Sequence, residues 1–420
     1  MTNIQKYADE AVALRRAIHK RPEEGWTEFE TTYRVVTTLE KLGYAVKCGL
    51  AVIDPRAVLG RNEALVAKAQ QRALEHGVPQ AFLDRLEGYT GAVAELDTGR
   101  AGPTTAFRFD MDCVLVSETT DPEHVPNKEG FASEIPGLMH ACGHDIHMTV
   151  CLGILSYFAE HQPKCDMTFI FQPAEENASG GKQLYESGEL DEWMPDEIYA
   201  FHDNPQLPAG AIGCCMGTLF AGTCEIHAKF IGKSGHAAFP HLANDMVVCG
   251  AQFVNQIQTI VSRNIDPIES GVVTLGHFEA GTTGNVIAGS CQIDGTIRAL
   301  TQVNNLKIQE RVRAIAEGVA KSFDCELELD LHQGGYLPVE NNDETTKNFI
   351  SYMKENKDVE FIETKPAMTG EDFGFLISKI PGTMFWLGVD SPYSLHSEHL
   401  APKEEAIQKG VSAMIGFLED

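Results

Sequence analysis

Four clusters of acidic, histidine and cysteine side chains follow short apolar runs that have the composition of β-strands. The clusters are Arg108-Phe109-Asp110-Met111-Asp112, His140-x-Cys142-x-His144-x-x-His147, Gln172-Pro173-Ala174-Glu175-Glu176-Asn177 and Phe201-His202-Asp203-Asn204-Pro205. Sites in open α/β sheets lie at the carboxyl ends of the strands. We therefore expect these clusters to contribute to metal-ligand chemistry.

Cys142 and His144 are the first candidates for metal ligands. A thiolate and an imidazole two residues apart suit Zn²⁺ or another first-row divalent ion. For an isolated pair of this kind, a buried thiol beside helix-capping residues is the more common explanation. His140, Asp145 and His147 lie within the same eight residues, and this density favours metal ligation. His140 and His147 themselves are expected to be structural or to support the ligands.

Two pairs of carboxylates offer acid–base chemistry. Asp110 and Asp112 point the same way in an extended chain and can share one cation or one imidazole, although such a pair is commonly a cap or a turn. Glu175 and Glu176 are adjacent and point in different directions. One can therefore bind a metal while the other accepts a proton from metal-bound water. Their position after an apolar run favours this function over a solvated surface pair.

Two more histidine-containing segments lie far away in the sequence. Leu395-His396-Ser397-Glu398-His399 follows an apolar run at 383–387. The segment 232–241 has the pattern of a loop that presents His236, since glycines allow unusual dihedral angles and Pro240 stiffens its exit. A histidine on a mobile second domain could reach a reacting carbonyl and stabilise the developing oxyanion.

The elements that must position these side chains alternate between strand and helix. This alternation predicts an α/β domain with a mixed, largely parallel sheet between helices. From about 222 to 330 the order changes to strand, helix, strand, strand, helix and strand, which predicts an inserted, smaller α+β domain of ferredoxin-like type. We expect a metal-binding catalytic domain at 1–215 and 335–420, with an insertion at about 52–90, and an inserted dimerisation or lid domain at 216–334.

Length and composition exclude several other classes of protein. A chain of 420 residues is too long for one ordinary core. The formal net charge of −27 is opposite in sign to that of a nucleic-acid binder, so we expect no nucleic-acid partner. No run of 18 apolar residues indicates a membrane span, and the N-terminus lacks the pattern of a signal peptide, so we expect a cytoplasmic enzyme. The eleven cysteines show no spacing typical of a disulfide framework.

Together these motifs resemble the amidohydrolase branch of the dinuclear-metal aminoacylase/carboxypeptidase family. That branch includes hippurate hydrolases, auxin-conjugate hydrolases, N-acetyldiaminopimelate deacetylases and aminobenzoyl-glutamate hydrolases. The resemblance covers essentially the whole chain. The segments that carry it are Arg108 to Asp112, Met139 to His147, Phe171 to Glu176, Gly235 to Pro240, Gly295 to Arg298, Met368 to Phe373 and Leu395 to Ser397.

The resemblance implies two divalent metal ions per chain and a role for each matching residue. It implies five metal ligands, namely Cys142, His144, Glu176, His202 and His396, with the cysteine standing where relatives use a bridging carboxylate. It further implies that Glu175 is the general base, that Asp112 orients a ligand and that His236 holds the carbonyl oxygen or the substrate carboxylate. Asn285 and Arg298 are candidates for gripping the free carboxylate of the substrate. Zn, Mn, Co and Ni all suit this ligand set, and the resemblance implies a homodimer formed through the inserted domain.

The resemblance therefore predicts hydrolysis of the amide bond of N-acyl amino acids. The part from about residue 232 onward is most similar to the N-acetyldiaminopimelate deacetylases. The insertion at 52–90 and the stretch 130–133 are more similar to the aminobenzoyl-glutamate hydrolase subunit. The residues after Asp112 are Cys113-Val114-Leu115-Val116, where relatives usually have Ala/Gly-Leu-Pro.

The alternatives to this amidohydrolase activity are a dipeptidase or glutamate carboxypeptidase, a single structural zinc, and a catalytically inactive metal-binding protein. The presence of all five ligands and the base argues against the last of these.

Overall fold

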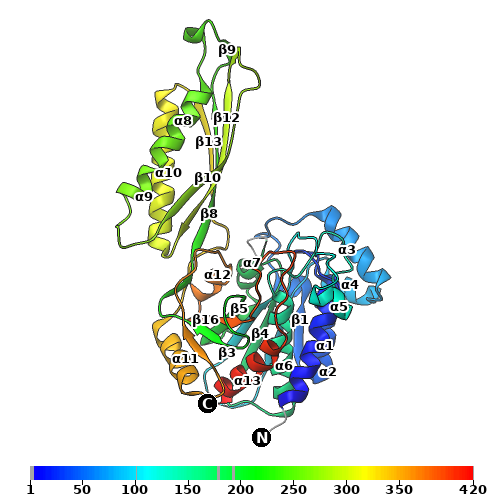
Figure 1. Cartoon of the computed structure of the whole chain (residues 1–420). Helices are drawn as coiled ribbons and strands as arrows, with labels where there is room; N and C mark the ends of the chain where they lie inside the picture. The colour runs from blue at the N-terminus through cyan, green and yellow to red at the C-terminus, as the bar shows by residue number, and fades with distance from the viewer. Residues whose placement is uncertain (1–3, 101, 177–179, 192–193, 420) are drawn as a thin grey trace. The chain divides into compact units, whose positions relative to one another are not determined.

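The computed structural model describes residues 4–100, 102–176, 180–191 and 194–419. The chain divides into two compact units, and each is described by itself (Figure 1). Unit 1 comprises Met1–Gly217, Asn341–Lys365 and Phe375–Asp420. Unit 2 comprises Thr218–Glu340 and Pro366–Gly374. The sequence groups 366–374 with the predicted catalytic domain, whereas these residues pack with unit 2.

Unit 1 is built on an eight-stranded mixed sheet. Its strands are β1 (Ala45–Cys48), β2 (Ala92–Leu96), β3 (Thr105–Asp110), β4 (Met167–Gln172), β5 (Glu197–Asn204), β6 (Ile212–Cys214), β15 (Phe361–Glu363) and β16 (Gly382–Gly388). They lie in the order β1-β2-β4-β3-β5-β16-β6-β15. The neighbours β4, β3, β5 and β16 are mutually parallel, so their carboxyl ends share one edge. The predicted α/β class with a mixed, largely parallel sheet is confirmed.

The central strands are buried on both faces because helices cover the sheet. Every residue of β3, β4 and β16 is buried, as expected for strands enclosed between layers. The helices of unit 1 are α1 (Ile4–His19), α2 (Phe29–Leu42), α3 (Glu63–Glu75), α4 (Gln80–Leu86), α5 (Val125–Glu129), α6 (His144–Glu160), α7 (Gly180–Glu186), α11 (Asp343–Glu355) and α13 (Glu405–Glu419), and α12 (Phe373–Ile377) begins in unit 2 and ends in unit 1.

Helix α6 is apolar on all sides because it is enclosed by other elements. It packs on β3 and β5, while α1, α2 and α13 pack against it. A helix that is apolar all round is buried all round, and α6 is buried from His144 to Leu155. This burial fixes the start of α6, where His144 and His147 lie, relative to the ends of the central strands.

Unit 2 is an antiparallel four-stranded sheet covered by helices. Its main strands are β8 (Gly222–Ile231), β10 (Val272–Ala280), β12 (Ser290–Ala299) and β13 (Glu326–His332), in the order β10-β12-β8-β13. The helices α8 (Met246–Ile257), α9 (Thr259–Arg263) and α10 (Gln302–Ser322) bury the apolar core of this unit. Short two-stranded ribbons join β9 (Gly235–His236) to β11 (Val286–Ile287) and β7 (Thr218–Phe220) to β14 (Val339–Glu340).

The described residues also show the character of the helices and the state of the cysteines. In the ranges given above, no helix combines the length and the apolar character that crossing a membrane would require. All eleven cysteines are present as thiols, and nine of them are buried. Cys142 is among the buried thiols.

Candidate metal centre

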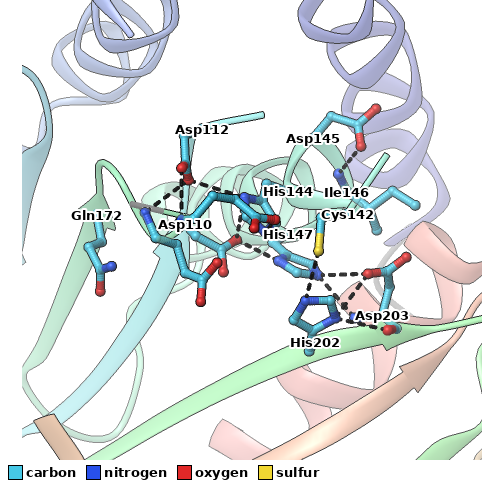
Figure 2. Close-up of polar contacts among 12 residues, drawn as sticks. Asp110, Asp112, Cys142, His144, Asp145, Ile146, His147, Gln172, His202 and Asp203 are labelled. Atoms are coloured by element: carbon cyan, nitrogen blue, oxygen red, sulfur yellow. Dashed lines mark hydrogen bonds and ion pairs between the residues drawn. The ribbon is translucent and has the colours of Figure 1, made fainter. Parts of the chain in front are cut away.

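The polar clusters that follow the parallel strands converge at one edge of the sheet in unit 1. Asp110 ends β3, the segment with Glu175 follows β4, and His202 lies near the end of β5. The start of α6 brings His144 to the same place (Figure 2). His396 arrives from the loop after β16, where its N–H donates to the carbonyl of Ala141 at 2.7 Å.

The five predicted ligands form two overlapping groups that share Cys142. In one group the donor atoms of Cys142, His144 and His202 lie within 4.8 Å of one another. In the other group the donor atoms of Cys142, Glu176 and His396 satisfy the same limit. The Cys142 sulfur is 3.4 Å from Nε2 of His202 and 3.3 Å from Nε2 of His396. Two ligand groups that share a thiol could hold two neighbouring metal ions.

The histidines of the site have their ring nitrogens oriented for metal binding. Nδ1 of His202 donates to the carbonyl of Asp203 at 2.9 Å, which leaves the Nε2 lone pair facing Cys142. Nδ1 of His144 lies 3.3 Å from a carboxylate oxygen of Asp112. Nε2 of His144 is buried and makes no hydrogen bond with any described residue. Metal-binding histidines usually hold a carbonyl or carboxylate with the other ring nitrogen in this way.

The charges around Cys142 also fit a bound cation. Burial raises the pKa of the Cys142 thiol well above its ordinary value, and the nearby carboxylates of Glu176, Glu175 and Asp203 raise it further. A thiolate in this position therefore requires compensating positive charge, and metal binding supplies that charge when it displaces the thiol proton. Glu175 lies in the site with its donor atoms within 4.8 Å of those of His144 and Glu176.

Asp112 connects the strand-end loops to His144. Its two carboxylate oxygens accept the backbone N–H groups of Glu175 at 3.1 Å and Glu176 at 3.0 Å. The same carboxylate faces Nδ1 of His144 at 3.3 Å. Asp112 is fully buried, so it holds one imidazole and the backbone of two glutamates in fixed relative positions.

His147 forms a similar connection between two strands. Its Nδ1 donates to Asp110 at 2.6 Å, and its Nε2 accepts the backbone N–H of Asp203 at 3.0 Å. His147 therefore holds β3 and β5 together beneath the site. His140, in contrast, is buried with neither ring nitrogen hydrogen-bonded to a described residue.

Asp203 is a residue that the sequence reasoning did not single out. Its carboxylate lies 3.1 Å from Nδ1 of His202 and 3.4 Å from Nε2 of His147. Its position next to a candidate ligand at a strand end was the available signal. Successive residues of a strand point to opposite faces, so the sequence predicts that His202 and Asp203 point away from each other. At the end of β5 both side chains nevertheless lie in the site.

The predicted substrate-binding residues all belong to unit 2, where they lie in two separate places. His236 and Asn285 are exposed neighbours on the β9–β11 ribbon, since Ala237 N–H donates to the Asn285 carbonyl at 3.1 Å. Arg298 lies at the opposite end of β12 from that ribbon. Its guanidinium donates to the carbonyl of Met368 at 3.1 Å, so within unit 2 it stabilises the attachment of the 366–374 segment.

The fold and the site define a metal-dependent hydrolase of amide bonds. The family model of peptidase family M20/M25/M40 matches residues 106–420. The chain belongs to this family.

Among its relatives is an N-acetyldiaminopimelate deacetylase of Ligilactobacillus salivarius, which is 63% identical over 98% of this chain and 97% of its own. A protein of the same name from Lactiplantibacillus plantarum is 70% identical over 74% of this chain and 80% of its own.

Solved structures show the same architecture. A putative aminohydrolase from methicillin-resistant Staphylococcus aureus has a TM-score of 0.82 at 26% identity, covering 99% of this chain and 98% of its own. A dinuclear metal binding peptidase of the M20 family from Bacillus subtilis has a TM-score of 0.75 at 25% identity, covering 98% of both chains.

Proposed function

We propose that this chain is an N-acetyldiaminopimelate deacetylase, which hydrolyses the acetyl amide to acetate and a free amine. The names and identities of its relatives support the substrate. The observation that carries the chemistry is the pair of ligand groups that share Cys142, with Glu175 beside both His144 and Glu176. Such a site can activate water and polarise a carbonyl at the same time.

The proposed ligand set is Cys142, His144 and His202 for one ion and Cys142, Glu176 and His396 for the other. Thiolate, imidazole and carboxylate ligands together accept Zn, Mn, Co or Ni. When bound, two such ions lower the pKa of a water molecule towards neutrality and polarise the acyl carbonyl. Metal analysis of the purified protein tests this proposal, and a single ion per chain would contradict it.

Glu175 is proposed to transfer the protons of the reaction. It is 5% exposed, so its carboxylate is largely shielded from bulk water while it lies within reach of the ligand cluster. It takes a proton from the attacking water and later gives that proton to the leaving amine.

His236 is proposed to stabilise the oxyanion. Its Nδ1 accepts the N–H of Ala238 at 3.0 Å, so the neutral ring carries its proton on Nε2 and can donate it to an oxygen.

Substitution of Glu175 tests the assignment of the base. Glu175→Gln keeps the size of the side chain but cannot accept a proton. We expect turnover to fall by about two orders of magnitude or more, in line with the loss of general base catalysis. The metal content, measured by mass spectrometry of the intact holoprotein, should be unchanged. Turnover close to that of the wild type would exclude Glu175 as the base.

The substrate is tested by comparing candidate amides at equal concentration. N-acetyldiaminopimelate, hippurate, aminobenzoyl-glutamate and a simple dipeptide represent the alternative activities. The proposal predicts the highest kcat/KM for N-acetyldiaminopimelate. A preference for the dipeptide or for aminobenzoyl-glutamate would instead indicate a peptidase or a glutamate-releasing hydrolase.

Unit 2 is proposed to serve as the dimerisation and lid domain. Its sheet has two edge strands, and the β10 edge carries Phe278, which is 43% exposed. Val247 and Val248 on α8 are 45% and 46% exposed. Exposed apolar side chains beside an unpaired strand edge support association. Sedimentation should give about twice the chain mass of 46.0 kDa, and Phe278→Lys should shift the protein to the monomer. The predicted cytoplasmic location stays a prediction.

A further inference from the structure

Glu28 is a buried carboxyl group that contacts the loop carrying the proposed base. It precedes α2, and its side chain is fully buried. Its Oε1 accepts the backbone N–H of Ala174 at 2.8 Å, and its Oε2 accepts the hydroxyl of Thr90 at 2.6 Å. Ala174 immediately precedes Glu175, so Glu28 binds the chain one residue before the proposed base.

Glu28 occupies the N-cap position of α2 without capping the helix. Its side chain makes no hydrogen bond to the first turn. The cap comes from Glu23, whose carboxylate accepts the N–H groups of Glu30 at 3.2 Å and Thr31 at 2.8 Å. An acidic group is expensive to bury unless it is hydrogen-bonded. Glu23 already accepts the N–H groups at the start of α2, so Glu28 is not needed as a helix cap. Its backbone contact outside the helix is the hydrogen bond from Ala174.

The loop that Glu28 holds has a strained backbone. Ala174 has φ of 54°, a left-handed conformation that costs a residue with a Cβ about 1–2 kcal/mol. Its N–H is held by Glu28, and the next two N–H groups, of Glu175 and Glu176, are held by Asp112. Three consecutive N–H groups are therefore bound by two buried carboxyl groups. This arrangement sets the directions in which both glutamate side chains leave the backbone.

We propose that Glu28 is a positioning residue for the reaction, because its hydrogen bond to Ala174 keeps Glu175 and Glu176 aimed at the ligand cluster. The proposal rests on the roles proposed above for these two glutamates.

Thr90, which orients Glu28, ends the insertion at about 52–90. The next residue is Gly91, where a Cβ would approach the ring of Pro173 to 2.7 Å. The exit of the insertion is thus packed against the same loop.

The protonation of Glu28 suggests a conservative replacement. Burial, followed by the nearby carboxylate of Asp112, raises the pKa of Glu28 to about 8. A glutamine side chain has nearly the same size and keeps an amide oxygen that can accept the N–H of Ala174, as Glu28 does. Glu28→Gln should therefore preserve the loop, whereas Glu28→Ala removes the acceptor from a buried N–H.

The experiment compares Glu28→Ala, Glu28→Gln and the wild type as holoproteins. For Glu28→Ala we expect kcat to fall about 10- to 100-fold, as for a small misplacement of reacting groups, with KM little changed. Metal affinity, measured by competition with a coloured chelator, should fall by about 10-fold or more because Glu176 is displaced. Glu28→Gln should restore both quantities to near the wild-type values. Glu23→Ala serves as the control, since it removes a buried carboxylate of the same segment and should lower the melting temperature without changing either quantity.

Two results would overturn the positioning role. One is a Glu28→Ala protein with normal kcat and metal affinity, and the other is a Glu28→Gln protein as impaired as Glu28→Ala. If Glu28→Ala does not fold, Thr90→Val removes only the hydroxyl that orients Glu28. It should then lower kcat severalfold, and an unchanged kcat would also overturn the proposal. Failure of the proposed function is recognised separately, by normal turnover in Glu175→Gln.

Discussion

Gly143 and Asp203 are in direct contact at the centre of the site. Gly143 has φ of 85°, and a Cβ on it would overlap the carboxylate of Asp203. The absence of a side chain therefore lets the loop with Cys142 and His144 lie against the end of β5, where His202 is located. Two of the predicted ligand segments meet through this one glycine.

Replacement of this glycine should disrupt the site more than the fold. We expect Gly143→Ala to lose most of its bound metal and at least about 100-fold in turnover, because the ligands on both sides of it are displaced. Gly130→Ala is the matched control. Gly130 has a similar φ of 76°, but a Cβ there would meet nothing within 4 Å. The control should lose about 1 kcal/mol of stability and keep its metal. Equal metal loss in both variants would show that backbone strain, and not contact with Asp203, is responsible.

The support given by Asp110 to His147 should be measurable as metal affinity. Asp110→Asn weakens the hydrogen bond that fixes His147 between β3 and β5. Loss of a group that orients the surroundings of a metal typically lowers affinity about 10- to 100-fold. Asp196→Asn is the control, since Asp196 binds the N–H of Thr104 at the opposite end of these strands. Chelator competition on both proteins gives the comparison, and equal affinities would refute the role of Asp110.

The thiolate of Cys142 should be visible by spectroscopy. A cobalt-substituted protein is expected to show a thiolate-to-cobalt charge-transfer band, because a coordinating thiol is deprotonated. Cys142→Ser should abolish the band. Cys113→Ser should retain it, although Cys113 is also buried and lies next to Asp112. A band that persists in Cys142→Ser would place the sulfur ligand elsewhere.

Acid should weaken the fold through Glu118. Burial alone would raise its pKa, but hydrogen bonds to His124 and His19 lower it to about 2. The unfolded chain has the higher pKa, near 4.5, so the stabilisation is complete above that value and is lost as the pH falls towards 2. This contribution is at most about 3 kcal/mol. The difference in melting temperature between the wild type and Glu118→Gln should therefore shrink between pH 6 and pH 3. A constant difference would show that the charge of Glu118 is not the cause.

Much of the architecture followed from local patterns. The short apolar runs before the clusters at 108–112, 172–177 and 201–205 predicted strands, and they form as β3, β4 and β5. The order of the strands in the sheet could not be predicted from these local patterns. For example, β16 pairs with β5, although Gly382 lies 178 residues after Asn204 in the sequence.

The sequence by itself determined the chemistry available to this protein. The side-chain types at 142, 144, 175 and 176 predicted metal-ligand and acid–base chemistry, and the resemblance of these motifs to a known family implied the full ligand set and the hydrolysis of an amide bond. The tertiary structure decided which groups face one another. Asp203, His147 and Glu28 acquired their contacts only when distant segments met, since a hydrogen bond depends on separations of about 3 Å that sequence spacing does not specify.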